Sequence, residues 1–141
     1  MTALLAAQLA LAAAYAGVQW TVRVLVYPQF TAVPADAWPA FHDGHSRRVA
    51  RVVGPLFAGQ TVTTGWLLLE LPSGAPRAAV LAGAACLGTV LCITALIAVP
   101  QHRRLGRGFD AAAHRRLLHA DSVRVLAATG SVLAAGWAAL G

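Results

Sequence analysis

The residues of this chain best suited to proton transfer or metal binding are its histidines, and all five fall in two short stretches. His42 and His45 lie in the first stretch, and His102, His114 and His119 lie in the second. Histidine changes its charge near neutral pH, and its neutral ring binds metal ions. Most of the eleven basic residues, all of them arginine, lie in or beside the same stretches. Proton-transferring and cationic groups are therefore gathered in two parts of the chain.

Two of these histidines have a spacing that is typical of metal ligands. His42 and His45 are three residues apart, which on a helix brings both rings to one side. Together with His102 from the second stretch, they are candidate ligands for a divalent metal such as copper or iron. Because Gly44 weakens a helix at this point, a site without any metal and a pair of solvated histidines both stay open.

A second constellation lies near the C-terminus. His114 and Asp121 are seven residues apart, and Arg124 follows one turn later, so a helix places all three on one face. Such a face suits proton transfer, with the carboxylate orienting a ring or balancing the arginine. The simpler alternative is an ion pair that only tolerates partial burial. The candidate catalytic residues are His42, His45, His114 and Asp121.

Further polar residues interrupt the apolar segments and are candidates for substrate binding. Gln19 and Arg23 are one turn apart, and Arg51 and Arg124 lie at a comparable depth. Three converging arginines would form a site for a carboxylate, a phosphate or a phenolate, although Arg23 could instead extend to the membrane surface. Gln60 must find polar partners in the bundle interior. The candidate substrate-binding set is Gln19, Trp20, Arg23, Tyr27, Arg51, Gln60 and Arg124.

Apolar helices must position these groups. The chain is 58% hydrophobic and 11% charged, which is far less charged than a usual soluble domain. Three of its apolar segments stop at Pro28, Pro72 or Pro100, and proline cannot continue a helical ladder. We therefore predict one all-α domain over residues 1–141, an integral membrane four-helix bundle. The segments that are long enough to cross a membrane are 3–27, 52–71, 77–99 and 117–140.

The connections between these segments differ in character. The middle one, 72–76, is predicted to be a tight turn. Residues 35–49 are predicted to form a short amphipathic helix between the first and second spans, with Asp36 as its N-cap. Residues 109–119 are predicted to lead helically into the last span, with Asp110 as N-cap.

The distribution of arginine predicts the orientation. The first connection carries three arginines and the last carries five, whereas the middle turn carries only Arg77. The positive-inside rule then places both long connections in the cytoplasm and both termini outside, in a bacterial inner membrane. The first apolar segment is too long for a cleavable signal and is predicted to stay as a span. Since membrane orientation accounts for the arginines, no nucleic-acid partner is predicted.

Short motifs along most of the chain resemble a known family. They are Tyr27-Pro-Gln-Phe30, Phe41-His42-Asp-Gly-His45, Gly54-Pro55, Val99-Pro-Gln-His102-Arg-Arg-Leu105 and Leu118-His-Ala-Asp121-Ser-Val-Arg124. This series is similar to small four-span bacterial membrane proteins and, more distantly, to the anthrone oxygenase family. Gln60 and the Asp121-Ser122 pair depart from the pattern of similar proteins, which carry an acidic residue and an Asn-Trp pair there.

The resemblance implies an oxygenase that oxidises an anthrone- or polyketide-type aromatic substrate, with or without a metal. A histidine would remove a proton, and Arg23 or Arg124 would stabilise the enolate. The alternative is a non-catalytic membrane protein that binds a metal or an anionic lipid, or a subunit of a larger complex. A transporter ranks last because four spans are few for alternating access. The expected partners are the membrane and a lipophilic small molecule or lipid, and a homo-oligomer stays open.

Overall fold

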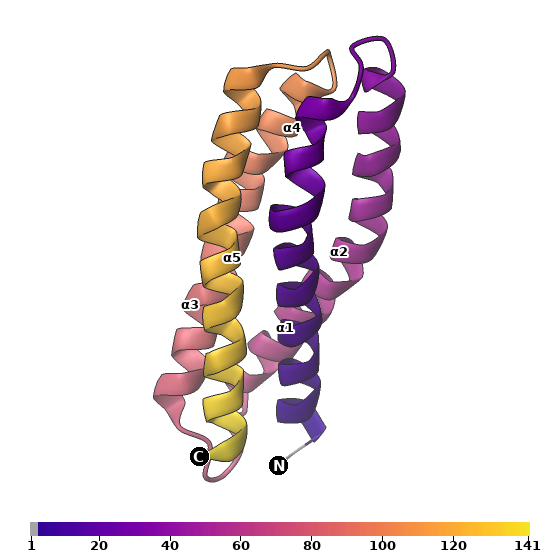
Figure 1. Ribbon diagram of the computed structural model, residues 1–141. Coiled ribbons are helices and arrows are strands. Elements are labelled where there is room, and N and C mark those ends of the chain that lie inside the picture. Colours follow the sequence, from indigo (N-terminus) through magenta and orange to yellow (C-terminus); the bar gives the residue numbers. More distant parts are fainter. Residues whose placement is uncertain (1–2) are drawn as a thin grey trace.

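The computed structural model describes residues 3–141 as a bundle of four long helical spans, with no β-strand among those residues (Figure 1). Each span is long and apolar enough to cross a membrane. The chain is therefore a multi-pass membrane protein with an all-α bundle fold, as the sequence predicts. The spans are Ala3–Ala32, Trp38–Leu69, Arg77–Leu105 and Ala111–Leu140.

The first and third spans each change helix type along their length. The first consists of α1 (Ala3–Thr21), the π-helix η1 (Val22–Val26) and the 3-10 helix η2 (Tyr27–Ala32). The third consists of α3 (Arg77–Ile93), the π-helix η3 (Thr94–Ala98) and α4 (Val99–Leu105). The second and fourth spans are single helices, α2 (Trp38–Leu69) and α5 (Ala111–Leu140).

The prolines explain where the helix type changes. Pro28 and Pro100 stand in the first turn of η2 and of α4, and each of these helices directly follows a π-helix. The backbone N–H that each proline lacks therefore falls where the hydrogen-bonding pattern of the span changes. The predicted ends of the first and third spans at these prolines were therefore wrong, because helical structure continues past both. α2 ends at Leu69, close to the predicted end at Pro72.

The start of α2 also differs from the prediction. A short separate helix is predicted from the sequence over 35–49. The structure is helical from Trp38 onward, but this segment is continuous with the second span and is not a separate element. Asp36 does not cap it, because the helix begins after Ala37 and no side chain bonds to its first turn. Pro39 in the first turn favours this later start.

The start of α5 agrees with the prediction. The Asp110 carboxylate accepts hydrogen bonds from the backbone N–H groups of Ala112, at 2.8 Å, and Ala113, at 3.0 Å. These bonds favour the ionised carboxylate, so they hold the pKa of Asp110 below its usual value. Asp110 therefore fixes the point at which the last span begins.

α5 packs between α1 and α3, whereas α2 packs mainly against α1 (Figure 1). Both termini and the middle turn lie at one end of the bundle, and the two long connections lie together at the other end (Figure 1). The two histidine-containing stretches therefore meet in space, although they are far apart in the sequence. We call this the connection end.

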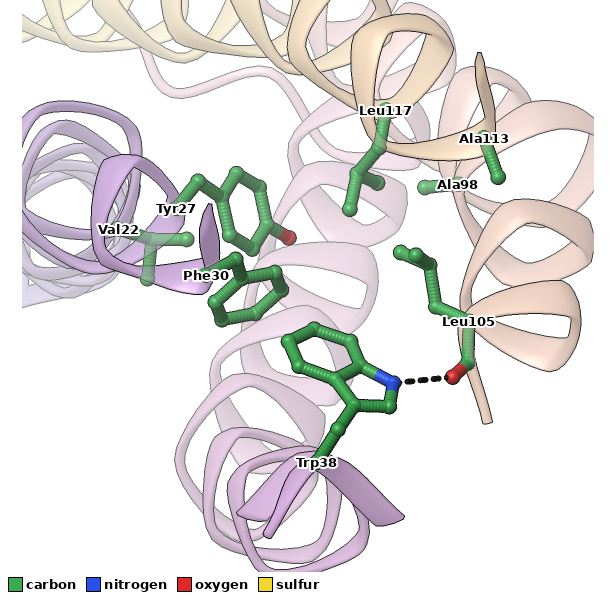
Figure 2. Packing of buried hydrophobic residues seen from close by; sticks show 8 residues of the cluster. All are labelled: Val22, Tyr27, Phe30, Trp38, Ala98, Leu105, Ala113 and Leu117. Atoms are coloured by element: carbon green, nitrogen blue, oxygen red, sulfur yellow. Dashed lines mark hydrogen bonds between the residues drawn. The ribbon is translucent and has the colours of Figure 1, made fainter. Parts of the chain in front are cut away.

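An aromatic and aliphatic cluster holds the connection end together (Figure 2). Trp38 is fully buried, and its indole N–H donates to the backbone oxygen of Leu105 at 2.7 Å. This bond joins the start of α2 to the end of α4, so it fixes the distance between the helices that carry the histidines. The buried members of the cluster are Val22, Tyr27, Phe30, Trp38, Ala98, Leu105, Ala113 and Leu117.

Candidate functional site

A cavity of about 700 Å³ opens between α2 and the η3–α4 part of the third span. Its size lies in the range of small-molecule sites. Most of its wall is apolar, and its polar lining residues gather near the connection end. The apolar lining includes Val49, Val53, Phe57, Ala98 and Val99. The polar lining includes Tyr27, His42, His45, His102, Arg103 and Arg124.

Two histidines and a tyrosine from three different elements form a chain of hydrogen bonds along this cavity. His42 Nε2 on α2 lies 3.2 Å from His102 Nδ1 on α4. His102 Nε2 lies 3.1 Å from the Tyr27 hydroxyl on η2. Tyr27 is 2% exposed, and Figure 2 shows its hydroxyl pointing away from Val22. Both ring nitrogens of His102 are thus engaged within the protein.

His45 lines the same cavity but is bonded differently. Its ring stands beside those of Phe30, at a centroid distance of 5.1 Å, and His102, at 6.2 Å. Its Nε2 is buried and has no hydrogen-bond partner among residues 3–141. Because no protein group bonds to this nitrogen, His45 is the cavity histidine whose ring could turn toward a bound molecule and act as a base.

Arg124 contributes a buried cation to the cavity wall. Its Nη2 donates to Gln19 Oε1 at 3.0 Å and to the Tyr15 hydroxyl at 3.3 Å. Its Nη1 lies 3.5 Å from Asp121 Oδ1, and Gln19 also donates to Asp121. Asp121 is fully buried and Arg124 is 7% exposed. The predicted proximity of these two residues is confirmed, and Gln19 belongs to the same network.

Three further candidates lie outside the lining of this cavity. His114 Nε2 lies 3.0 Å from the backbone oxygen of Tyr27, so His114 fixes the position of η2. Arg23 donates to Ser122 Oγ at 3.2 Å. Gln60 is 1% exposed and faces the bundle interior, as predicted. The amide nitrogen of Gln60 has no hydrogen-bond partner among residues 3–141, so the polar partners expected for it are not seen. His114 and Arg23 connect elements around the site, and none of the three residues lines it.

Two other candidates are on the outside of the bundle. Arg51 is exposed, so the predicted convergence of three arginines was wrong. The remaining two, Arg23 and Arg124, both lie close enough to Asp121 for their positive charges to interact with its carboxylate. Trp20 is 48% exposed and donates to Thr129 at 3.2 Å, so it lies away from the cavity.

The predicted metal ligands share the cavity without forming a metal site. No group of three His, Cys, Asp or Glu side chains within residues 3–141 has the arrangement that could hold a metal ion. His42 and His102 bond to each other, and the second nitrogen of His102 contacts Tyr27. Of the alternatives that the sequence left open, a copper or iron site formed by His42, His45 and His102 is therefore not supported by this geometry.

The sequence analysis missed Tyr15, which contacts Arg124 in the buried network. The signal was present, because Tyr15 stands four residues before Gln19, at the spacing that links Gln19 to Arg23. The Tyr15 hydroxyl also donates to Gln19 Oε1 at 2.9 Å. Tyr15 therefore limits the positions that Arg124 can take.

Comparison of the chain with protein-family models, with curated proteins and with solved structures gave no match. The resemblance to anthrone oxygenases consequently stays a prediction. What the site can do follows from its own chemistry, namely a lipophilic cavity with a free histidine nitrogen and a buried guanidinium at its polar end.

Proposed function

We propose that the chain is a membrane enzyme that removes a proton from a lipophilic aromatic substrate in this cavity and oxidises the resulting carbanion with dioxygen. One observation carries the proposal: His45, with its unpaired Nε2, and the buried cation of Arg124 line the same largely apolar cavity. An apolar site with a few convergent polar groups is typical of small-molecule binding. A cavity bordered by α2 and by the η3–α4 part of the third span also suits a substrate that arrives through lipid.

His45 acts as the base in this reaction, and Arg124 stabilises the charge that forms. Proton removal from the CH₂ group of an anthrone, which is conjugated with the carbonyl group across the ring, leaves an enolate whose oxygen needs a cation or hydrogen-bond donors. Asp121 and Gln19 hold the Arg124 guanidinium in place before the substrate binds. A pre-positioned charge in a site of low dielectric lowers the barrier more than the same charge in water.

The oxidation needs only dioxygen as a second reactant. The carbanion forms a bond to dioxygen, and the resulting peroxide takes up a proton. Loss of the second proton from the same carbon, with cleavage of the O–O bond, gives a carbonyl group and water. One CH₂ group and one O₂ molecule are thus converted into one carbonyl group and one water molecule, and no step involves a metal.

The second candidate is a site that binds an anionic lipid without catalysis. Arg103 and Arg124 both line the cavity, and arginine binds phosphate and carboxylate groups well. A lipid phosphate would need these arginines but would have no use for the unpaired nitrogen of His45. Substitution of His45 therefore separates the two functions.

The test compares His45→Gln with His119→Gln in purified protein supplied with an anthrone. His119 is exposed and lies outside the cavity lining, so it is the matched control. We expect the wild type and His119→Gln to convert one anthrone per dioxygen consumed, and His45→Gln to be slower by about 100-fold or more. Equal rates in His45→Gln and the wild type, or a wild-type rate equal to that of spontaneous oxidation, would contradict the proposal.

A further inference from the structure

A chain of hydrogen bonds runs from Tyr27, which lies beside the buried cation of Arg124, to the connection end of the cavity. The Tyr27 hydroxyl lies 3.1 Å from His102 Nε2. His102 Nδ1 lies 3.2 Å from His42 Nε2. All four side chains line the cavity. The proposed oxidation uses only Arg124 among these four side chains. The hydrogen bonds that join Tyr27, His102 and His42 therefore have no role in that reaction as described above.

The donors and acceptors in this chain follow from the chemistry of arginine. The neighbouring Arg124 guanidinium can only donate, so it cannot accept the Tyr27 proton. The single proton of Tyr27 then has two uses. In one arrangement Tyr27 donates to His102 Nε2, and His102 Nδ1–H donates to His42. In the other, His42 donates to His102, His102 donates to the Tyr27 oxygen, and the Tyr27 proton is free to bond to a molecule in the cavity.

We propose that Tyr27, His102 and His42 form a proton relay in which Tyr27 is the group that gives a proton to the bound molecule. The Tyr27 proton moves to that molecule, the His102 Nε2 proton moves to the Tyr27 oxygen, and the His42 Nε2 proton moves to His102 Nδ1. In the same movement His42 takes up a proton at Nδ1 from the solvent, so that no ring becomes an anion. One proton enters, one leaves, and no electron moves.

The position of the chain in the bundle fits this direction of transfer. Tyr27 is 2% exposed and is itself part of the buried cluster at the connection end, so it has little contact with water even where it borders the cavity. His42 is also buried, but its neighbours Asp43 and Gly106 are exposed and line the same opening. A Cβ atom added at Gly106 would lie 3.8 Å from His42 Cε1, so the His42 ring is a direct neighbour of Gly106. His42, which must take up a proton from water, is therefore the member of the hydrogen-bond chain that lies nearest to water.

The relay rests on the proposed function only for the identity of the group that accepts the Tyr27 proton. In the proposed oxidation, that group is the oxygen released when the O–O bond breaks. The hydrogen-bond chain itself is present without any substrate. A merely structural chain would settle into one arrangement of protons, because a fixed arrangement satisfies every donor. A relay must populate both arrangements, and the tautomer of His102 distinguishes them.

The test is ¹⁵N NMR of the full chain, labelled on histidine and reconstituted in lipid nanodiscs without added substrate. We expect His102 in the wild type to exchange between its Nδ1–H and Nε2–H tautomers, with a ¹⁵N–¹⁵N coupling to His42 across their hydrogen bond. In Tyr27→Phe we expect a single tautomer. Tyr15→Phe is the matched control: it removes another hydroxyl that contacts Arg124 but leaves the chain intact, so both tautomers should remain.

A single His102 tautomer in the wild type overturns the relay, whatever the variants show. Exchange that persists unchanged in Tyr27→Phe overturns it as well, because Tyr27 would then play no part. Neither result depends on catalysis, so the relay can fail while anthrone oxidation by the wild type stands. Conversely, tautomer exchange in a protein that does not oxidise anthrones would retain the relay and remove the proposed reaction.

Discussion

At the scale of single residues, Arg124 raises the clearest energetic question, because a buried cation inside a membrane bundle is costly without partners. Asp121, Gln19 and Tyr15 supply those partners. Asp121 is the only carboxylate in the network, and its Oδ2 has no hydrogen-bond partner within residues 3–141. The negative charge of Asp121 is therefore the main compensation for Arg124.

Asp121→Asn should consequently destabilise the bundle strongly. The substitution keeps the size of the side chain but leaves the Arg124 charge uncompensated, and removal of one partner of a buried pair costs about 3–5 kcal/mol. Asp43→Asn is the control, because Asp43 pairs with Arg47 on the exposed surface, where such pairs contribute about 0–1 kcal/mol. Thermal unfolding of both variants in one detergent measures the difference. Similar melting temperatures for the two variants would show that Asp121 does not compensate the charge.

The spacing rules predicted part of this residue-scale picture. Asp121 and Arg124 lie one turn apart on one helix, so their proximity could be read directly from the sequence. His114 shares their face and is buried as expected, but its partner is the backbone oxygen of Tyr27 on another span. No spacing within one helix shows which backbone group another span will present, and the role of His114 could not be predicted for that reason.

At the scale of elements, the two π-helices have the greatest consequence for the site. η1 comes directly before Tyr27, and η3 comes directly before the helix that carries His102. A π-turn accommodates an extra residue in an α-helix and often occurs at functional sites. Each π-helix therefore sets the rotation of the segment that follows it, and with it the direction of one cavity side chain.

Deletion of Leu96 from η3 tests this role. Leu96 is 74% exposed, so its side chain contributes little to the packing of the bundle. Removing one residue should restore α-helical register and rotate α4 by about 100° relative to α3, which turns His102 away from His42 and Tyr27. We expect a folded protein that has lost the ¹⁵N coupling between His102 and His42.

Leu96→Ala provides the control for that deletion, because it removes the same side chain and keeps the register. It should retain the coupling. If the deletion variant also retains it, then η3 does not set the orientation of α4. The sequence did not predict either π-helix, because hydropathy and proline position locate a span without specifying which turn holds an extra residue.

At the scale of the whole molecule, the arrangement of the four spans was predictable, whereas the cavity was not. Apolar length and turn residues indicated the spans, and an even number of them brings both termini to one end, as Figure 1 shows. The cavity exists because α2 packs against α1 and leaves space beside η3 and α4. Such separation depends on how side chains of different helices interlock, which a single sequence does not reveal.

The arginine distribution also predicts the orientation of the whole bundle. We expect the connection end in the cytoplasm, because eight arginines lie in its two connections or in the helical segments next to them, within residues 47–51 and 103–116, against Arg77 at the middle turn. Single cysteines at Ser73 and Arg107, in a chain with both native cysteines replaced by alanine, can be labelled with a maleimide that does not cross membranes. In intact bacterial host cells, Ser73→Cys should react and Arg107→Cys should react only after lysis. The reverse pattern would place the cavity opening outside.

The binding of 2-hydroxyanthraquinone tests the central claim most directly, because its absorption spectrum distinguishes the phenol from the phenolate. The wild type should bind one molecule as phenolate, at a pH where the free compound is neutral, with the proton on His45 and the negative oxygen beside Arg124. His45→Gln and Arg124→Lys should lose the phenolate band, while Arg51→Lys, which alters an exposed arginine outside the cavity, should keep it. Saturable binding of the neutral phenol alone, or a phenolate band that survives in both cavity variants, would contradict the proposed site.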